Sequence, residues 1–179
     1  MEGNMEIKSK IDGKLIFKDD GATIKLTVEA AVKLKIYMQD ANMQGAYMQG
    51  TDMRGANMQG AYMQGAYMRY ADMRYADMRG ADMRGAYMLG ANMRDAIIKD
   101  GVKLKAKTSI LQCGPAGSRQ DYIIIFNTDI GLYVKAGCFL YTLDKFVLAV
   151  KTKHGGTVYE KEYLNILKMA KAHFKLWNK

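Results

Sequence analysis

Apolar residues recur with a period of five between Ala41 and Asp95, where one pentapeptide pattern is repeated eleven times without interruption. Each repeat has Ala (once Thr) at its first position and Met at its third, with polar or aromatic residues on either side of the Met. A five-residue step advances about 500° around an α-helix, so successive Met residues would drift about 140° and form no apolar face. The pattern therefore excludes a plain amphipathic helix.

In an extended chain, the first and third residues of each repeat point to one side, and the second and fourth point to the other. Because five is odd, the chain must turn once per repeat to keep every Met on the same side. Gly at the fifth position of most repeats permits the positive φ angle that such a turn needs. We predict a coil lined by Ala and Met. Disordered low complexity is the alternative, which the continuous apolar lining opposes.

The predicted core consists of the central residue of each repeat, which is always Met. Because Met is unbranched and polarisable, it can fill a narrow column much as Leu would. Stacked thioethers could instead bind Cu(I), which prefers soft ligands. Buried columns without His or Cys favour the packing role, so we expect neither a metal nor a cofactor. The core residues are Met43, Met48, Met53, Met58, Met63, Met68, Met73, Met78, Met83, Met88 and Met93.

These repeats resemble the pentapeptide-repeat family, whose pattern is a small residue, Asp or Asn, a central Leu or Phe, and two outward residues. The resemblance implies an all-β, right-handed quadrilateral β-helix, a solenoid with four repeats per coil. The central Met departs from the family pattern. Incomplete units around Met38 and Ile98 extend the array, and Lys103 would have to face inward in the next unit. We therefore place the solenoid at residues 36–105.

Four repeats per coil would place residues twenty apart above one another, about 4.8 Å apart. One face then carries a column of Tyr, and the next carries Asp or Asn beside Arg. Such a surface could bind bases or anionic partners; the favoured alternative is that these columns stabilise the coil, as cross-strand pairs do. Tyr70 and Tyr75 replace the turn Gly and are the best candidates for contact. The candidate binding surface is Tyr47, Tyr67, Tyr87, Tyr70, Tyr75, Arg54, Arg74 and Arg94.

Two non-repeating flanks are predicted to complete the chain. Residues 1–35 predict a β-hairpin around Asp12 and Gly13, then a helix with Thr23 as its N-cap, whose apolar face covers the first coil. Residues 106–179 predict a small α+β domain: about three antiparallel strands, a loop around Pro115, and two helices. The helices span 143 to about 153, capped by Thr142 and a C-terminal Gly, and about 158 to 177. Both flanks resemble segments of phage-type and prophage pentapeptide-repeat proteins.

The net charge of +9 is concentrated at the C-terminus, with +1 before residue 36, +2 in the solenoid and +6 after residue 105. The last predicted helix carries a basic stripe of Lys161, Lys168, Lys171 and Lys175. This stripe could bind a polyanion through phosphate contacts. A solvated helix face is favoured, because no aromatic residue is interleaved with it.

No apolar run approaches the ~18 residues of a membrane helix, and the first residues lack the apolar core of a signal peptide. We therefore expect a cytoplasmic protein that does not bind membranes. Cys113 and Cys138 are then expected to be thiols, with a disulfide between them as the alternative.

Groups for catalysis are scarce: the chain has two His, His154 and His173, and no Walker loop or Gly-x-Ser-x-Gly motif. The best enzymatic hypothesis would pair Cys138 as nucleophile with His154 as base. A buried thiol and a polar helix end explain both residues without catalysis. We expect no enzyme.

Two non-enzymatic functions remain. The first is a rigid β-solenoid scaffold or protein-binding module of phage type, with an unknown protein or a second copy of itself as partner. The second follows well-studied family members that interact with DNA gyrase, a topoisomerase, and protect it. That role needs an acidic rod that mimics DNA, and the 9 basic and 7 acidic side chains of residues 36–105 oppose it.

Overall fold

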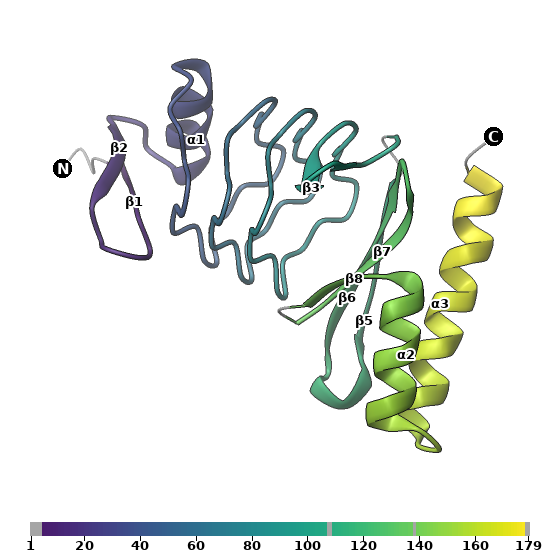
Figure 1. The fold of residues 1–179 in the computed structure, drawn as a ribbon. Helices are drawn as coiled ribbons and strands as arrows, with labels where there is room; N and C mark the ends of the chain where they lie inside the picture. The colour runs from purple at the N-terminus through teal and green to yellow at the C-terminus, as the bar shows by residue number, and fades with distance from the viewer. Residues whose placement is uncertain (1–4, 107–108, 138, 178–179) are drawn as a thin grey trace.

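The computed structural model describes residues 5–106, 109–137 and 139–177. A hairpin and a helix lie at one end of a coil of repeats, and a sheet with two helices lies at the other (Figure 1). The hairpin pairs β1 (Met5–Lys8) with β2 (Leu15–Asp19), and α1 (Ile24–Lys33) follows it. Thr23 is the N-cap of α1, as predicted, since its Oγ1 accepts the N–H of Leu26 at 3.3 Å.

The N-terminal elements supply hydrogen-bond acceptors to the first coil, residues 36–55. In later coils, the preceding coil supplies these acceptors; the N–H of Asp72, for example, donates to Thr51 O at 2.9 Å. In the first coil, the backbone N–H of Asn42 donates instead to Lys8 O of β1 at 2.8 Å. The backbone N–H of Asp52 donates to Glu29 Oε1 of α1 at 3.0 Å. Because the exposed strand edge is satisfied, the hairpin and α1 close this end of the coil.

Within the coil, residues twenty apart are joined by isolated parallel bridges, such as Asn57 with Asp77. Each central Met from Met43 to Met78 donates its N–H to the carbonyl nineteen residues later, as Met48 does to Tyr67 O at 2.8 Å. Each turn is closed by a bond from the next repeat's first residue back to that Met, as from Ala66 to Met63 O at 3.0 Å. The structure thus has the twenty-residue register that the sequence predicts.

The interior of the coil is filled by the first and third residues of the repeats. All eleven central Met side chains are at most 2% exposed. Thr51, which replaces Ala once, is also buried, and its hydroxyl donates to Met48 O at 2.8 Å. The one polar side chain at these inward positions therefore has its hydrogen bond.

The coil ends in a short antiparallel hairpin of β3 (Ile97–Lys99) and β4 (Val102–Lys103). Gly101 turns the chain with a φ of 70°. Val102 and Leu104 are buried while Lys103 is exposed. The reversal avoids a coil in which Lys103 would face inward.

A four-stranded antiparallel sheet in the order β5-β6-β7-β8 closes the second end. One face, including Ile124, Phe126 and Tyr133, packs against the Met-lined core. The other, including Ile125 and Val134, packs against the two helices, so the sheet lies between them and the coil (Figure 1). The elements are β5 (Ile110–Ala116), η1 (Gly117–Arg119), β6 (Asp121–Thr128), β7 (Gly131–Ala136), β8 (Phe139–Thr142), α2 (Leu143–His154) and α3 (Val158–Trp177).

Three details differ from the sequence prediction. The last predicted strand is divided, because Gly137 adopts a φ of 57° and β7 and β8 pair with each other, so the sheet has four strands rather than about three. The loop expected around Pro115 is largely strand, since β5 continues to Ala116. Thr142 occupies the N-cap position of α2, but its side chain makes no capping hydrogen bond.

Candidate binding surface

The tyrosine column exists as a stack of rings. Tyr47 and Tyr67 are stacked with ring centroids 4.6 Å apart, and Tyr67 and Tyr87 with centroids 4.9 Å apart. Tyr122 of β6 meets Tyr87 edge-on at 5.5 Å and ends the column. The ring faces of Tyr67 are occupied by its neighbours, whereas Tyr47 is 72% exposed. The column therefore contributes to the stability of the coil and leaves its first ring open to a partner.

In the arginine column, Arg54 and Arg74 each bind the carboxylate of the Asp in the same repeat. Arg74 donates to Asp72 through Nε at 2.9 Å and through Nη2 at 2.7 Å, and Arg54 binds Asp52 in the same way. Arg94 follows Asn92 instead of an Asp, and its Nε lies 3.4 Å from Asp95 Oδ2. Hydrogen bonds from Arg74 hold the pKa of Asp72 below its usual value. These guanidinium groups already have anionic partners, which favours the stabilising role.

The same pairing occurs on the other two faces of the coil. Asp77 binds Arg79, and Asp82 binds Arg84. The signal was available in the sequence as the tripeptide Asp-Met-Arg, which places the two side chains on the same outward side.

Tyr70 and Tyr75 adopt φ angles of 59° and 62°, in the left-handed region that the turn Gly occupies elsewhere. The ring of Tyr70 lies over Gly90, where an added Cβ would come 2.5 Å from the ring. The guanidinium of Arg69 lies 5.5 Å from the centre of the same ring. Tyr70 therefore covers one corner of the coil while remaining 58% exposed.

Tyr75 takes part in a different environment. It lines a hollow of about 710 Å³ between α1 and the coil, together with Arg54, Asp52 and Lys33. Its hydroxyl lies 3.4 Å from Nη2 of Arg94. The hollow thus brings Lys33 of α1 near Arg54 and Tyr75, a neighbourhood that the repeat pattern alone does not predict.

The repeat geometry agrees with a comparison against protein families. Residues 36–74 and 61–100 match the model for pentapeptide repeats, with 8 copies. Residues 36–100 are therefore a run of pentapeptide repeats. Such repeats generally form a right-handed quadrilateral β-helix, and the matched residues are those joined by the twenty-residue bridges. Searches of curated proteins and of solved structures gave no match.

The basic stripe lies away from the pentapeptide repeats. Lys161, Lys168, Lys171 and Lys175 are exposed on α3, which packs on the side of the sheet that faces away from the coil (Figure 1). The opposite face of α3 is buried through Leu167, Ala170 and other apolar residues. The structure therefore does not join the stripe to the aromatic and arginine columns.

The cysteines and His154 were the candidates for catalysis or a disulfide. Burial raises the pKa of the Cys113 thiol. Cys138 lies outside the described residues, so the expected thiol at this position, the alternative disulfide with Cys113 and the enzymatic hypothesis with His154 lie outside them too. The His154 ring lies 5.7 Å from that of Tyr163, between their centroids. Over the described ranges, no group of three His, Cys, Asp or Glu side chains could hold a metal, and no helix is long and apolar enough to cross a membrane.

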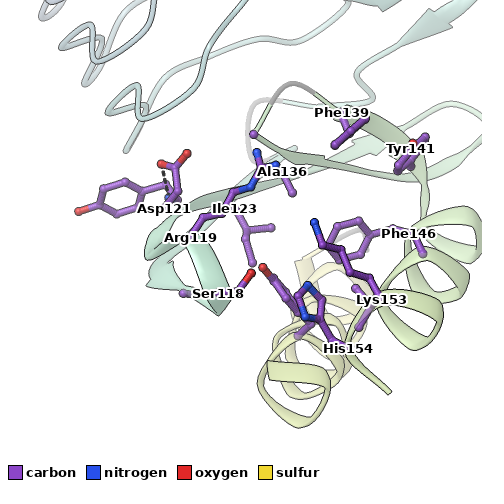
Figure 2. Close-up of a pocket in the computed structure, with 16 residues that line it drawn as sticks. Ser118, Arg119, Asp121, Ile123, Ala136, Phe139, Tyr141, Phe146, Lys153 and His154 are labelled. Carbon is purple, nitrogen blue, oxygen red and sulfur yellow. Dashed lines mark hydrogen bonds between the residues drawn. The ribbon is translucent and has the colours of Figure 1, made fainter. Parts of the chain in front are cut away.

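A pocket of about 250 Å³ that the sequence does not predict lies between the sheet and α2 (Figure 2). Its lining includes Arg119, Lys153, His154 and Tyr163, which come from η1, α2 and α3. No motif connects these residues in the sequence. Only the packing of the helices on the sheet brings them together.

Proposed function

We propose that this pentapeptide-repeat protein is a non-enzymatic scaffold that binds a protein partner through one face of its solenoid. Its solenoid would be the family's right-handed quadrilateral β-helix, residues 36–105, held between an N-terminal cap of residues 1–35 and a C-terminal domain of residues 106–179. The resemblance of both flanks to phage-type proteins supports a phage or prophage origin.

One observation carries the proposal. The faces with Asp and Arg pair their charges internally and expose single tyrosines, Tyr37 and Tyr75, whereas one face gathers several large apolar groups. We call this the aromatic face and define it as Tyr47, Tyr67, Tyr70, Tyr87 and Leu89. Tyr47, Tyr70 and Leu89 are 72%, 58% and 62% exposed.

The aromatic face has the composition of a protein interface. Tyr side chains bring a large contact area with few rotatable bonds, and aromatic residues are enriched at the centres of interfaces. Stacking of Tyr67 between its neighbours holds the rings in place before a partner arrives, which lowers the entropy cost of binding. Arg69, beside Tyr70, adds one cation. A partner with apolar and acidic side chains, including a second copy of the chain, would complement this face.

The test is photo-crosslinking of the tagged protein in its native cells, followed by mass spectrometry. The variant Tyr47→Ser/Leu89→Ser changes exposed side chains only, and Gln44→Ser/Gln64→Ser changes the exposed polar pair of another face. We expect the wild type and the Gln variant to crosslink the same protein, and the aromatic-face variant to lose it. Identical crosslinks from all three proteins would contradict the proposal.

The topoisomerase alternative gains no support from the geometry. A DNA mimic presents free carboxylates along a rod, but Asp52, Asp72 and Asp77 each bind an Arg of the same repeat. We expect micromolar protein neither to inhibit supercoiling by DNA gyrase nor to relieve quinolone poisoning. Either effect would revive this alternative.

A further inference from the structure

The pocket between the sheet and α2 has an apolar interior that the scaffold function does not use. Ile123 of β6, Ala136 of β7, and Phe146 and Val150 of α2 line it. Ile123, Phe146 and Val150 are buried among the residues that join the sheet to the helices. The helices lie on one side of the sheet and the coil on the other (Figure 1), and the buried lining of the pocket belongs to the helix side. At its rim the pocket adjoins the aromatic face, because Tyr122 lines the pocket and meets Tyr87 edge-on.

Two cations lie at this pocket. Arg119 ends η1, and Lys153 lies in the last turn of α2; their side chains reach over the pocket from opposite sides (Figure 2). Neither makes an ion pair or a side-chain hydrogen bond with any part of the chain that the structure describes. Arg119 lies close against Gly137, where an added Cβ would come 2.7 Å from its Nη1. The guanidinium is thus placed by packing, and no carboxylate of the described residues pairs with it.

The carboxylates near the pocket are directed elsewhere. Asp121 is the one acid among the described lining residues, and its Oδ1 accepts the N–H of Tyr122 at 2.7 Å. The same oxygen lies on the coil side, 3.8 Å from the position that a Cβ on Gly85 would take, and Figure 2 shows it pointing out of the pocket. Glu162 of α3 accepts the N–H of Gly117 at 2.7 Å. The charge left at the pocket is therefore positive.

We infer that this pocket binds a small amphipathic carboxylate: one aromatic or branched aliphatic group that fills the apolar interior, with its carboxylate between Arg119 and Lys153. A volume of about 250 Å³ is below the range of pockets for drug-sized ligands, which suits a single ring or side chain. Guanidinium and ammonium groups form charge-assisted hydrogen bonds with carboxylates. Tyr163, whose hydroxyl lies against Gly117, is an additional donor at the pocket.

This chemistry is shared by free aryl acids and by the last residue of a peptide. Phenylacetate represents the free acid, N-acetyl-Gly-Phe represents a peptide C-terminus, and N-acetyl-Gly-Phe-amide removes the charge. Full-length ¹⁵N-labelled protein is titrated with each probe and followed by NMR. We expect shifts at the amides of Ile123, Ala136 and Val150 for at least one acid, with the amide probe about tenfold weaker or worse. The acid that binds more tightly identifies the source.

Three variants distinguish binding in the pocket from a general attraction of the acid to positive charge. Lys153→Met removes one cation at an exposed position, Ala149→Phe fills the pocket from an exposed position of α2, and Lys151→Met is the matched control on the same helix. We expect the first two to weaken the acid by about tenfold or more and the control to leave its affinity unchanged. The inference is overturned if neither acid shifts the pocket amides, if the amide probe binds equally well, or if Lys151→Met weakens binding as much as Lys153→Met.

Discussion

The repeat domain and the C-terminal sheet with its helices use charged residues in opposite ways. In the repeat domain, Asp72 and Arg74 stand two residues apart on the same outward side and bind each other, and three more repeats do the same. In the C-terminal part, Arg119 and Lys153 come from distant segments and meet at a pocket without a carboxylate partner among the described residues. Local repetition thus neutralises its own charges, whereas charge that is free to bind a ligand arises where non-repeating segments meet.

The two regions also build their cores differently. The coil stacks one residue type, Met, in equivalent positions every five residues. The sheet instead buries both faces of β6, whose alternate residues belong to two different cores. The following predictions test this contrast, beginning with the largest expected effect.

Met68→Lys should unfold the repeat domain cooperatively. Met68 is fully buried, and a charge there would have no partner, at a cost of several kcal/mol. Met68→Leu nearly conserves volume and should cost less than about 1.5 kcal/mol. Urea unfolding followed by circular dichroism measures both changes. Equal stability of the two variants would mean that Met68 faces solvent.

Gln112→Ala should loosen the junction between the two regions. Gln112 of β5 accepts the N–H of Met88 at 3.0 Å and donates to Ala86 O at 2.5 Å. Removing it leaves these buried backbone groups unpaired, at a cost of about 1–3 kcal/mol. The matched control is Gln44→Ala, whose side chain bonds only to exposed Gln64. If both substitutions lower the free energy of unfolding equally, the sheet does not close the coil through Gln112.

Tyr67→Ala should destabilise the protein modestly. It removes two stacked pairs, with Tyr47 and with Tyr87, each worth roughly 0.2–1 kcal/mol. Tyr47→Ala, which removes one pair, should have the smaller effect in the same urea titration. A larger loss for Tyr47→Ala would place the rings in a different order.

Arg74→Ala should have the smallest effect, and the effect should depend on pH. Hydrogen bonds from Arg74 lower the pKa of Asp72 from its ordinary 3.8, so the pair stabilises the fold above that pKa and loses this contribution as the pH falls through the lowered value. We expect a lower urea midpoint than the wild type near pH 7, and a difference between the two proteins that shrinks as the pH falls below the ordinary pKa of Asp72. A difference that persists unchanged in acid would show that Arg74 acts through packing.

The repeat domain was largely predictable because its contacts follow from its period. The inward Met, the turn at the fifth residue and the Tyr column all depend on residues at fixed spacing. The role of Arg74 was harder to predict, since a column of Arg suits both an anion platform and an internal ion pair. Its partner two residues earlier decides between them.

The C-terminal part was less predictable because its arrangement rests on non-local contacts. The run of apolar residues in β6 predicts a buried strand but does not show that one face meets the coil and the other meets the helices. The division at Gly137 depends on β8 pairing back onto β7. Likewise, Arg119 and Lys153 carry no motif, and only the packing of α2 on the sheet places them at one pocket.

The central claim is that hydrogen bonds between successive coils hold Met43 to Met78, the central residues of eight repeats, inward. Amide hydrogen exchange tests it residue by residue. The amides of Met48 and Met68 donate to Tyr67 O and Tyr87 O at 2.8 Å, whereas those of Gln49 and Arg69 make no backbone hydrogen bond within the described ranges. We predict slow exchange at Met48, Met68 and the equivalent Met residues, and fast exchange at Gln49 and Arg69, giving protection with a period of five. Uniformly fast exchange, or protection that follows a helical period, would contradict the account.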